Sequence, residues 1–195
     1  ICFDEVQSGC GRTGRWFASE HVGITPDVIT LGKGLTSSLP VSAVIGPRWL
    51  LDLAAPGEMS STHSGNPISA AAALANLNAL EQDNAIEASQ RTGELVLQKL
   101  RLLQQRYPDR IHSVHGKGLF ISVHLVTPNS GERDLALADA ITLNAICRGV
   151  MLFFTGGGFL KITPPLCIEP EAAMEAIDVL DESFEAAVER SKDST

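Results

Sequence analysis

A long helix is expected over residues 85–106, and it separates two parts of the sequence that differ in texture. Before it, short apolar segments alternate with stretches rich in Gly, Ser, Thr and Pro. Tyr107-Pro108 ends the helix, because proline has no amide hydrogen and its ring does not fit a helix interior. We therefore expect an N-terminal α/β part (residues 1–82), a connecting helix (83–107) and a small α+β domain (108–195).

The N-terminal part contains few but clear element signals. Residues 28–31 and 41–45 have the apolar, β-branched character of strands. Asn66 is a good helix N-cap and Pro67 suits a first helical position, so a helix begins there. Residues 68–80 are almost wholly Ala and Leu, and we expect this helix to be buried on most sides.

The C-terminal part has the alternating pattern of a compact α+β domain. A glycine turn at residues 116–118 joins two of its expected strands, and Gly149 follows one of its helices. The expected strands are 111–115, 119–125, 151–154 and 160–163, and the expected helices are 135–147 and 170–190.

Composition excludes several classes of function. The net charge of −8 argues against nucleic acid and anionic membrane as partners, and no apolar run is long enough to span a bilayer. The four cysteines form no C-x-x-C pair, so we expect free thiols in a reducing, cytoplasmic compartment. His112 and His115 are three apart on an expected strand and point to opposite faces, so we assign no metal site.

The first residues, ICFDE, form an apolar strand end followed by two acids. The backbone groups of such a strand need partners on both sides, so we expect the chain to be part of a longer protein. The pattern is also typical of a Walker B segment, in which the acids serve Mg²⁺ and water. The matching G-x-x-x-x-G-K-[ST] loop is absent, because Lys33 and Lys117 are each followed by Gly.

Two further stretches suggest chemistry. Lys33 follows an expected strand and lies between Gly32 and Gly34, which leave its amine unshielded by neighbouring side chains. The hydroxyl run at residues 60–64, which includes Thr62, precedes a helix N-terminus that favours an anion. Taken alone, a strand-end Asp4, a solvated lysine and a Ser/Thr cap each have an ordinary structural explanation.

One cofactor would use all three signals. Pyridoxal phosphate (PLP) needs an amine for its aldehyde, a carboxylate for its ring nitrogen and an anion site for its phosphate. A magnesium ATPase would explain the acids and leave Lys33 and Thr62 without a role. The residues therefore favour a PLP enzyme.

Several motifs resemble those of class III (ornithine/4-aminobutyrate type) aminotransferases. They are FDEVQSG at residues 3–9, GRTG at 11–14, GKG at 32–34, GNP at 65–67 and ITPPL at 162–166. The resemblance covers nearly the whole chain and corresponds to the C-terminal half of the family. It implies the α/β fold of the PLP-dependent transferases of fold type I (aspartate aminotransferase-like), with the remainder of the large domain followed by the small domain.

The resemblance also implies roles for particular residues. Asp4 would bind the pyridine nitrogen, Val6 would lie against the ring and Gln7 would approach the ring hydroxyl. Lys33 would be the Schiff-base lysine and then the general base of the proton shift. Thr62 would donate to the cofactor phosphate of a neighbouring subunit, so that a homodimer shares its active sites.

Three departures from the family pattern carry information. Lys161 stands where members that bind an α-carboxylate usually have Arg, and lysine lacks the planar fork that grips a carboxylate. His115 replaces an Arg, which we interpret as a structural change in the small-domain sheet. The family's phosphate loop and ring-stacking aromatic residue have no counterpart in this chain, so the chain alone is expected to have weak activity or none.

The expected function is transfer of an amino group from an amine or amino acid to a 2-oxo acid by a ping-pong route. An aminomutase, racemase or decarboxylase on the same scaffold would carry the same motifs. A non-catalytic fragment or assembly subunit is the alternative from a different class, and the Walker-type ATPase is a more distant one.

Overall fold

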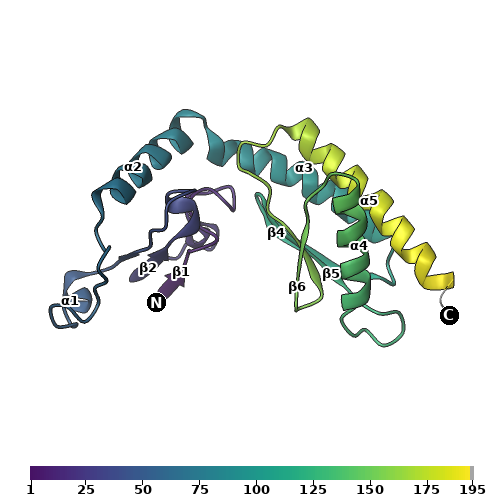
Figure 1. Ribbon diagram of the computed structural model, residues 1–195, viewed down its shortest axis with the longest axis horizontal. Coiled ribbons are helices and arrows are strands. Elements are labelled where there is room, and N and C mark those ends of the chain that lie inside the picture. The colour runs from purple at the N-terminus through teal and green to yellow at the C-terminus, as the bar shows by residue number, and fades with distance from the viewer. Residues whose placement is uncertain (194–195) are drawn as a thin grey trace. The chain divides into compact units, whose positions relative to one another are not determined.

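The computed structural model describes residues 1–193. The chain forms two compact units, Ile1–Ala88 and Ser89–Thr195, and each is described by itself. Figure 1 shows the first unit in purple to blue and the second in teal to yellow.

The first unit is built around a three-stranded sheet of order β1-β2-β3. Strands β1 (Cys2–Asp4) and β2 (Val28–Leu31) are parallel, and Asp4 pairs with Thr30. Strand β3 (Ala43–Ile45) runs antiparallel to β2. The remaining elements of this unit are the 3₁₀ helices η1 (Ala18–His21) and η2 (Lys33–Leu35) and the helices α1 (Arg48–Leu51) and α2 (Pro67–Gln82).

Helix α2 begins as expected. The Asn66 side chain accepts a hydrogen bond from the Ile68 amide at 2.8 Å, and Pro67 occupies the first helical position. The expectation that the helix is buried on most sides is wrong, because none of its residues is buried. One face packs partly against the small core of this unit (buried Cys10, Leu31 and Leu35), but nothing in the described unit covers the other faces, where Ile68 is 69% and Leu74 62% exposed.

The second unit contains a four-stranded antiparallel sheet of order β4-β5-β7-β6. Its strands are β4 (Ile111–Lys117), β5 (Phe120–Leu125), β6 (Phe153–Thr155) and β7 (Phe159–Ile162). The helices are α3 (Ala85–Arg106), which starts in the first unit, α4 (Leu135–Cys147) and α5 (Pro170–Asp193).

All three helices contribute to one hydrophobic core on a single face of this sheet. Buried and less buried residues alternate along β5 and β7, as a strand with one covered face requires. The core side of these strands carries Ile121, Val123, Leu125, Leu160 and Ile162, which form one cluster with Leu100 of α3, Ile141 of α4 and Phe184 of α5.

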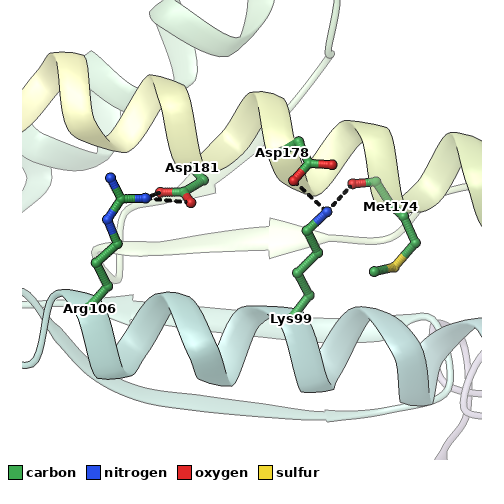
Figure 2. A network of polar contacts seen from close by, with 5 residues as sticks. All are labelled: Lys99, Arg106, Met174, Asp178 and Asp181. Atoms are coloured by element: carbon green, nitrogen blue, oxygen red, sulfur yellow. Dashed lines mark hydrogen bonds and ion pairs between the residues drawn. The ribbon is translucent and has the colours of Figure 1, made fainter.

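Polar contacts join α3 to α5 above this core (Figure 2). The Lys99 ammonium donates to the Met174 carbonyl at 3.0 Å and pairs with Asp178. One guanidinium nitrogen of Arg106 contacts both carboxylate oxygens of Asp181, at 2.7 and 2.8 Å. Ion pairs near the surface contribute little to stability, so the apolar core dominates the packing of α3 on α5.

Most expected elements of both units are confirmed. The helices at 85–106 and 135–147 and the strand at 28–31 have the expected ends, and other ends shift by up to three residues. The short helices η1, η2 and α1 were not expected. No helix among the described residues is long and apolar enough to cross a membrane.

Gly93 of α3 packs directly against the turn between β4 and β5. A Cβ atom at Gly93 would lie 2.1 Å from the Gly118 carbonyl oxygen and 2.6 Å from the Gly118 Cα. The Leu119 amide donates to the Ser89 hydroxyl at 3.3 Å beside this contact. The second unit therefore requires glycine at position 93 for a steric reason.

We expect Gly93→Ala to lower the free energy of unfolding by about 1–3 kcal/mol or more, because backbone atoms must move apart. Alanine is more favourable than glycine in a helix interior by about 1 kcal/mol. The loss of stability should appear despite this gain. Urea unfolding followed by circular dichroism measures the change. The matched control is Gly156→Ala, whose added methyl group meets no atom within 4 Å; equal stability of the two variants would contradict the steric explanation.

Candidate active site

Asp4 lies at the carboxyl end of β1, beside the end of the parallel strand β2. Its Oδ1 accepts hydrogen bonds from the Val6 amide and from the Thr30 hydroxyl, both at 3.1 Å. Its Oδ2 accepts none from the described residues. The carboxylate is therefore held by one oxygen and presents the other at the sheet edge where open α/β folds bind ligands.

Lys33 reaches the same edge from the neighbouring strand. Strand β2 ends at Leu31, and Gly32 continues in an extended conformation before Lys33 begins η2. Lys33 has φ 38°, in the left-handed region that residues other than glycine seldom occupy, and its side chain is exposed. Strained backbone of this kind concentrates at functional sites, where the surrounding structure holds it.

The loops that carry these two residues pack directly against each other. A Cβ atom at Gly32 would lie 3.3 Å from Cγ1 of Val6, and one at Gly34 would lie 3.2 Å from Cβ of Cys10. Val6 is thus a neighbour of Gly32, the residue before Lys33. Gln7 follows Val6 in the same turn and is half-buried.

Asn76 of α2 fixes the loop that follows Lys33, a role that was not predicted. Its side-chain amide donates to the carbonyl oxygens of Gly34 at 2.8 Å and Leu35 at 3.3 Å. Its side-chain oxygen accepts from the Ser37 hydroxyl at 2.8 Å. The sequence feature that could have indicated this role is an amide side chain inside a helix made mostly of Ala and Leu.

Glu5 is buried under the site and supports it structurally. Its side chain is 1% exposed and accepts hydrogen bonds from the Ser19 amide at 2.9 Å and from the Ser8 hydroxyl. Its own amide donates to the Thr30 carbonyl at 3.0 Å, which extends the β1–β2 pairing by one residue. Burial, and then the Glu5 charge, raise the pKa of the Cys10 thiol, so Cys10 is a poor nucleophile there.

Thr62 and Lys161, the other two predicted site residues on separate segments, are carried by an exposed turn of the first unit and by a strand of the second. Thr62 lies in an exposed turn closed by the Ser64 amide and Ser61 carbonyl at 3.0 Å, and it makes no hydrogen bond to Asp4 or Lys33 in the described chain. Lys161 belongs to the second unit, on β7 opposite Ser122, and borders a mostly apolar cavity of about 580 Å³ beside α5. Among the described residues, no group of three or more His, Cys, Asp or Glu side chains could hold a metal ion.

Comparison with known proteins assigns the family. The family model for class-III aminotransferases matches residues 1–184. The chain belongs to the class-III aminotransferase family. The family expectation from the motifs around Asp4 and Lys33 is thereby confirmed, and the family uses PLP.

Relatives with different activities are about equally similar. A leucine/methionine racemase of Thermococcus litoralis is 38% identical over 185 residues, which are 94% of this chain and 42% of the relative. A 4-aminobutyrate aminotransferase of Mycobacterium leprae is 37% identical over 179 residues, which are 91% of this chain and 40% of the relative. The chain spans 39–43% of the length of the curated relatives it matches.

The fold expectation is also confirmed. The structure of an ornithine aminotransferase from Toxoplasma gondii, which holds PLP at partial occupancy, superposes with a TM-score of 0.87 at 29% identity. The match covers 98% of this chain and 44% of that one. The fold is that of class-III aminotransferases of fold type I, over part of their length.

We expect Glu5→Ala to lower the free energy of unfolding by about 1–3 kcal/mol, because the buried Ser19 amide loses its acceptor. Glu5→Gln keeps an acceptor oxygen and nearly the same side-chain volume, so its free energy of unfolding should fall less. Both tryptophans, Trp16 and Trp49, lie in the first unit, so their fluorescence during urea unfolding reports on it. The control is Glu81→Ala at an exposed position of α2; a loss equal to that of Glu5→Ala would contradict the supporting role.

Proposed function

We propose that the protein carrying this sequence is a PLP-dependent aminotransferase that moves an amino group from an amine or amino acid to a 2-oxo acid. The observation that carries the proposal is the placement of Asp4 and Lys33 at one edge of adjacent parallel strands. A lysine and a carboxylate with one oxygen unbonded at this edge are two of the three groups that PLP needs, the third being an anion site for its phosphate.

The residues present fit the cofactor. The free Oδ2 of Asp4 can accept from the ring nitrogen, and Val6 supplies an apolar side chain next to the Lys33 loop. Lys33 would hold the cofactor covalently through its amine, with Gln7 near the ring hydroxyl and Thr62 on the phosphate. When bound, PLP supplies an electron-accepting ring that stabilises a carbanion at the substrate carbon.

The chain's own residues account for proton movement and orientation. Lys33, with its amine freed, would accept the proton from the substrate carbon and would donate it again to complete the 1,3-proton shift. Gly32 and Gly34 let the Lys33 loop approach Val6 and Cys10 closely, and the Asn76 hydrogen bonds limit the movement of the loop. Asp4, fixed by the Val6 amide and Thr30, keeps its second carboxylate oxygen in place for the ring nitrogen.

We also propose a homodimer with shared active sites. Thr62 is exposed and makes no hydrogen bond to Asp4 or Lys33 within the described chain. This placement suits a residue that contributes to the active site of a second copy. Large apolar side chains of the same region are exposed in the single chain, among them Trp49, Met59, Ile68 and Leu74. A second copy is the partner that we propose to cover part of them.

The proposed organisation keeps the expected boundaries. Residues 1–82 would complete a large PLP-binding domain, 83–107 would form the connecting helix and 108–195 the small domain. The acidic net charge of −8 disfavours nucleic acid and anionic membranes as partners. We propose a cytoplasmic location, in which the four cysteines stay reduced.

Racemization of an amino acid is the second candidate function. The 38% identity to a leucine/methionine racemase favours it as much as the 37% identity to a 4-aminobutyrate aminotransferase favours transamination. A racemase interconverts L- and D-amino acids without consuming a 2-oxo acid. Chiral chromatography of alanine, leucine or methionine incubated without a 2-oxo acid therefore separates the two candidates.

Covalent capture of the cofactor tests the proposed role of Lys33. We expect PLP to give an absorbance band near the visible edge, and borohydride to fix the cofactor on the peptide that contains Lys33. Lys33→Ala should lose the band and the adduct entirely, because the loop that carries Lys33 packs directly against the loop that carries Asp4. The control is Lys117→Ala, which removes another lysine flanked by glycines; adducts spread equally over several lysines would refute the assignment.

Replacing the lysine at position 161 tests substrate binding in the native protein that carries this sequence. Lys161→Arg should lower the KM for 2-oxoglutarate about three- to tenfold, because a guanidinium binds a carboxylate through two parallel hydrogen bonds. Steady-state kinetics with 2-oxoglutarate and pyruvate measure the effect. Lys117→Arg on β4 serves as the control, and an unchanged carboxylate preference in Lys161→Arg would count against the role of Lys161.

A further inference from the structure

The short helix η2 of the first unit begins and is followed by residues whose backbone is in the left-handed region. Lys33 has φ 38° and Ser37 has φ 63°, although neither is glycine. Residues with a side chain seldom adopt this conformation, and it persists only where the surrounding structure holds it. The backbone of Lys33 therefore depends on contacts outside the residue itself.

Backbone hydrogen bonds tie Lys33 to the residues that follow η2. The Lys33 carbonyl oxygen accepts from the Ser37 amide at 3.1 Å and from the Thr36 amide at 3.4 Å. The last carbonyl groups of a helix have no partner within it, and here they belong to Gly34 and Leu35. These two carbonyl groups need donors from another part of the chain.

Asn76 of α2 supplies both donors and binds Ser37 as well. Its side-chain NH₂ group donates to the carbonyl oxygens of Gly34 at 2.8 Å and Leu35 at 3.3 Å. Its side-chain oxygen accepts from the Ser37 hydroxyl at 2.8 Å, and the Ser37 amide in turn donates to the Lys33 carbonyl. Only an amide side chain combines two donors with an acceptor in this way, and a carboxylate of the same size has no donor.

Local preference within α2 does not explain an asparagine at position 76. Asparagine is less favourable than alanine in a helix interior, because its side chain competes for backbone hydrogen bonds. Asn76 lies on the helix face that also carries Ala73 and Leu77, which pack against the core of the first unit. A local rule that is broken at a packed position indicates a tertiary role, and the contacts of Asn76 place that role at the Lys33 loop.

We infer that Asn76 is a positioning residue that holds Lys33 in its left-handed conformation and so keeps the Lys33 amine at the edge where PLP would bind. The inference rests on the proposed function only for the use that the amine is put to. Without the Asn76 amide, two carbonyl groups lose their donors and the strained backbone relaxes towards more populated conformations. The amine would then spend less time in the position that faces the Asp4 loop.

Hydrogen exchange tests the inference on the native protein that carries this sequence, prepared without PLP. The measured groups are the Thr36 and Ser37 amides, followed by mass spectrometry of the peptides that contain them. Asn76→Ala should speed their exchange about tenfold, because local opening becomes easier when the side-chain hydrogen bonds are lost. Asn76→Asp keeps the size but not the donors and should have at least the same effect. Asn78→Ala, at an exposed position of the same helix, should leave the exchange unchanged.

The rate of cofactor capture tests the consequence for Lys33. In Asn76→Ala the absorbance band formed with PLP should appear about tenfold more slowly, because a misplaced amine reacts less often. Borohydride should still fix the cofactor on the peptide that contains Lys33, and Asn78→Ala should react at the native rate. Ser37→Ala removes only the hydrogen bond to the Asn76 oxygen, so it should slow capture about two- to threefold and tests the inference even where Asn76→Ala fails to fold.

Two results would overturn the inference: unchanged exchange of the Thr36 and Ser37 amides in the Asn76 variants, or capture slowed equally by Asn76→Ala and Asn78→Ala. The exchange measurement needs no cofactor, so it decides whether Asn76 holds the loop independently of the proposed function. A native protein that captures no PLP on Lys33 would refute the proposed function alone. Capture at the native rate in Asn76→Ala would refute only the positioning role.

Discussion

The parallel pairing of β1 with β2 is the contact on which the proposed chemistry depends. It aligns Asp4 with Thr30, and the hydrogen bond between their side chains orients the carboxylate. Because parallel strands end at a common edge, Lys33 emerges from β2 beside the acid although the two residues are far apart in sequence. Neither residue would meet the other in an isolated turn or hairpin.

Polar side chains hold the loops at the carboxyl ends of β1 and β2, and the apolar core of the first unit is small. Glu5 binds the Ser19 amide and Asn76 binds the carbonyls after Lys33, so side-chain hydrogen bonds fix the two loops. The buried apolar cluster beside the strands of the first unit consists of Cys10, Leu31 and Leu35, whereas the cluster of the second unit is much larger. The first unit therefore leaves much apolar surface exposed, and this surface is what the proposed dimer would use.

The two faces of the second unit's sheet differ in character. Alternation along β5 and β7 sends Val123 and Leu160 into the core beneath the helices, while His124 and Lys161 point the other way. The covered face supplies stability, and the tight contact of Gly93 with Gly118 sets how closely α3 approaches. The other face carries the polar residues His115, Ser122, His124 and Lys161, which are less buried than the core residues.

Local patterns in the sequence were enough to predict most helices and strands, the family and the candidate roles of Asp4 and Lys33. Capping, periodicity and glycine placement depend on near neighbours, so they are visible in the chain itself. Burial of α2 was predicted wrongly, and the role of Asn76 was missed. Those features depend on which surfaces meet across long sequence separations, and only the packed structure decides that.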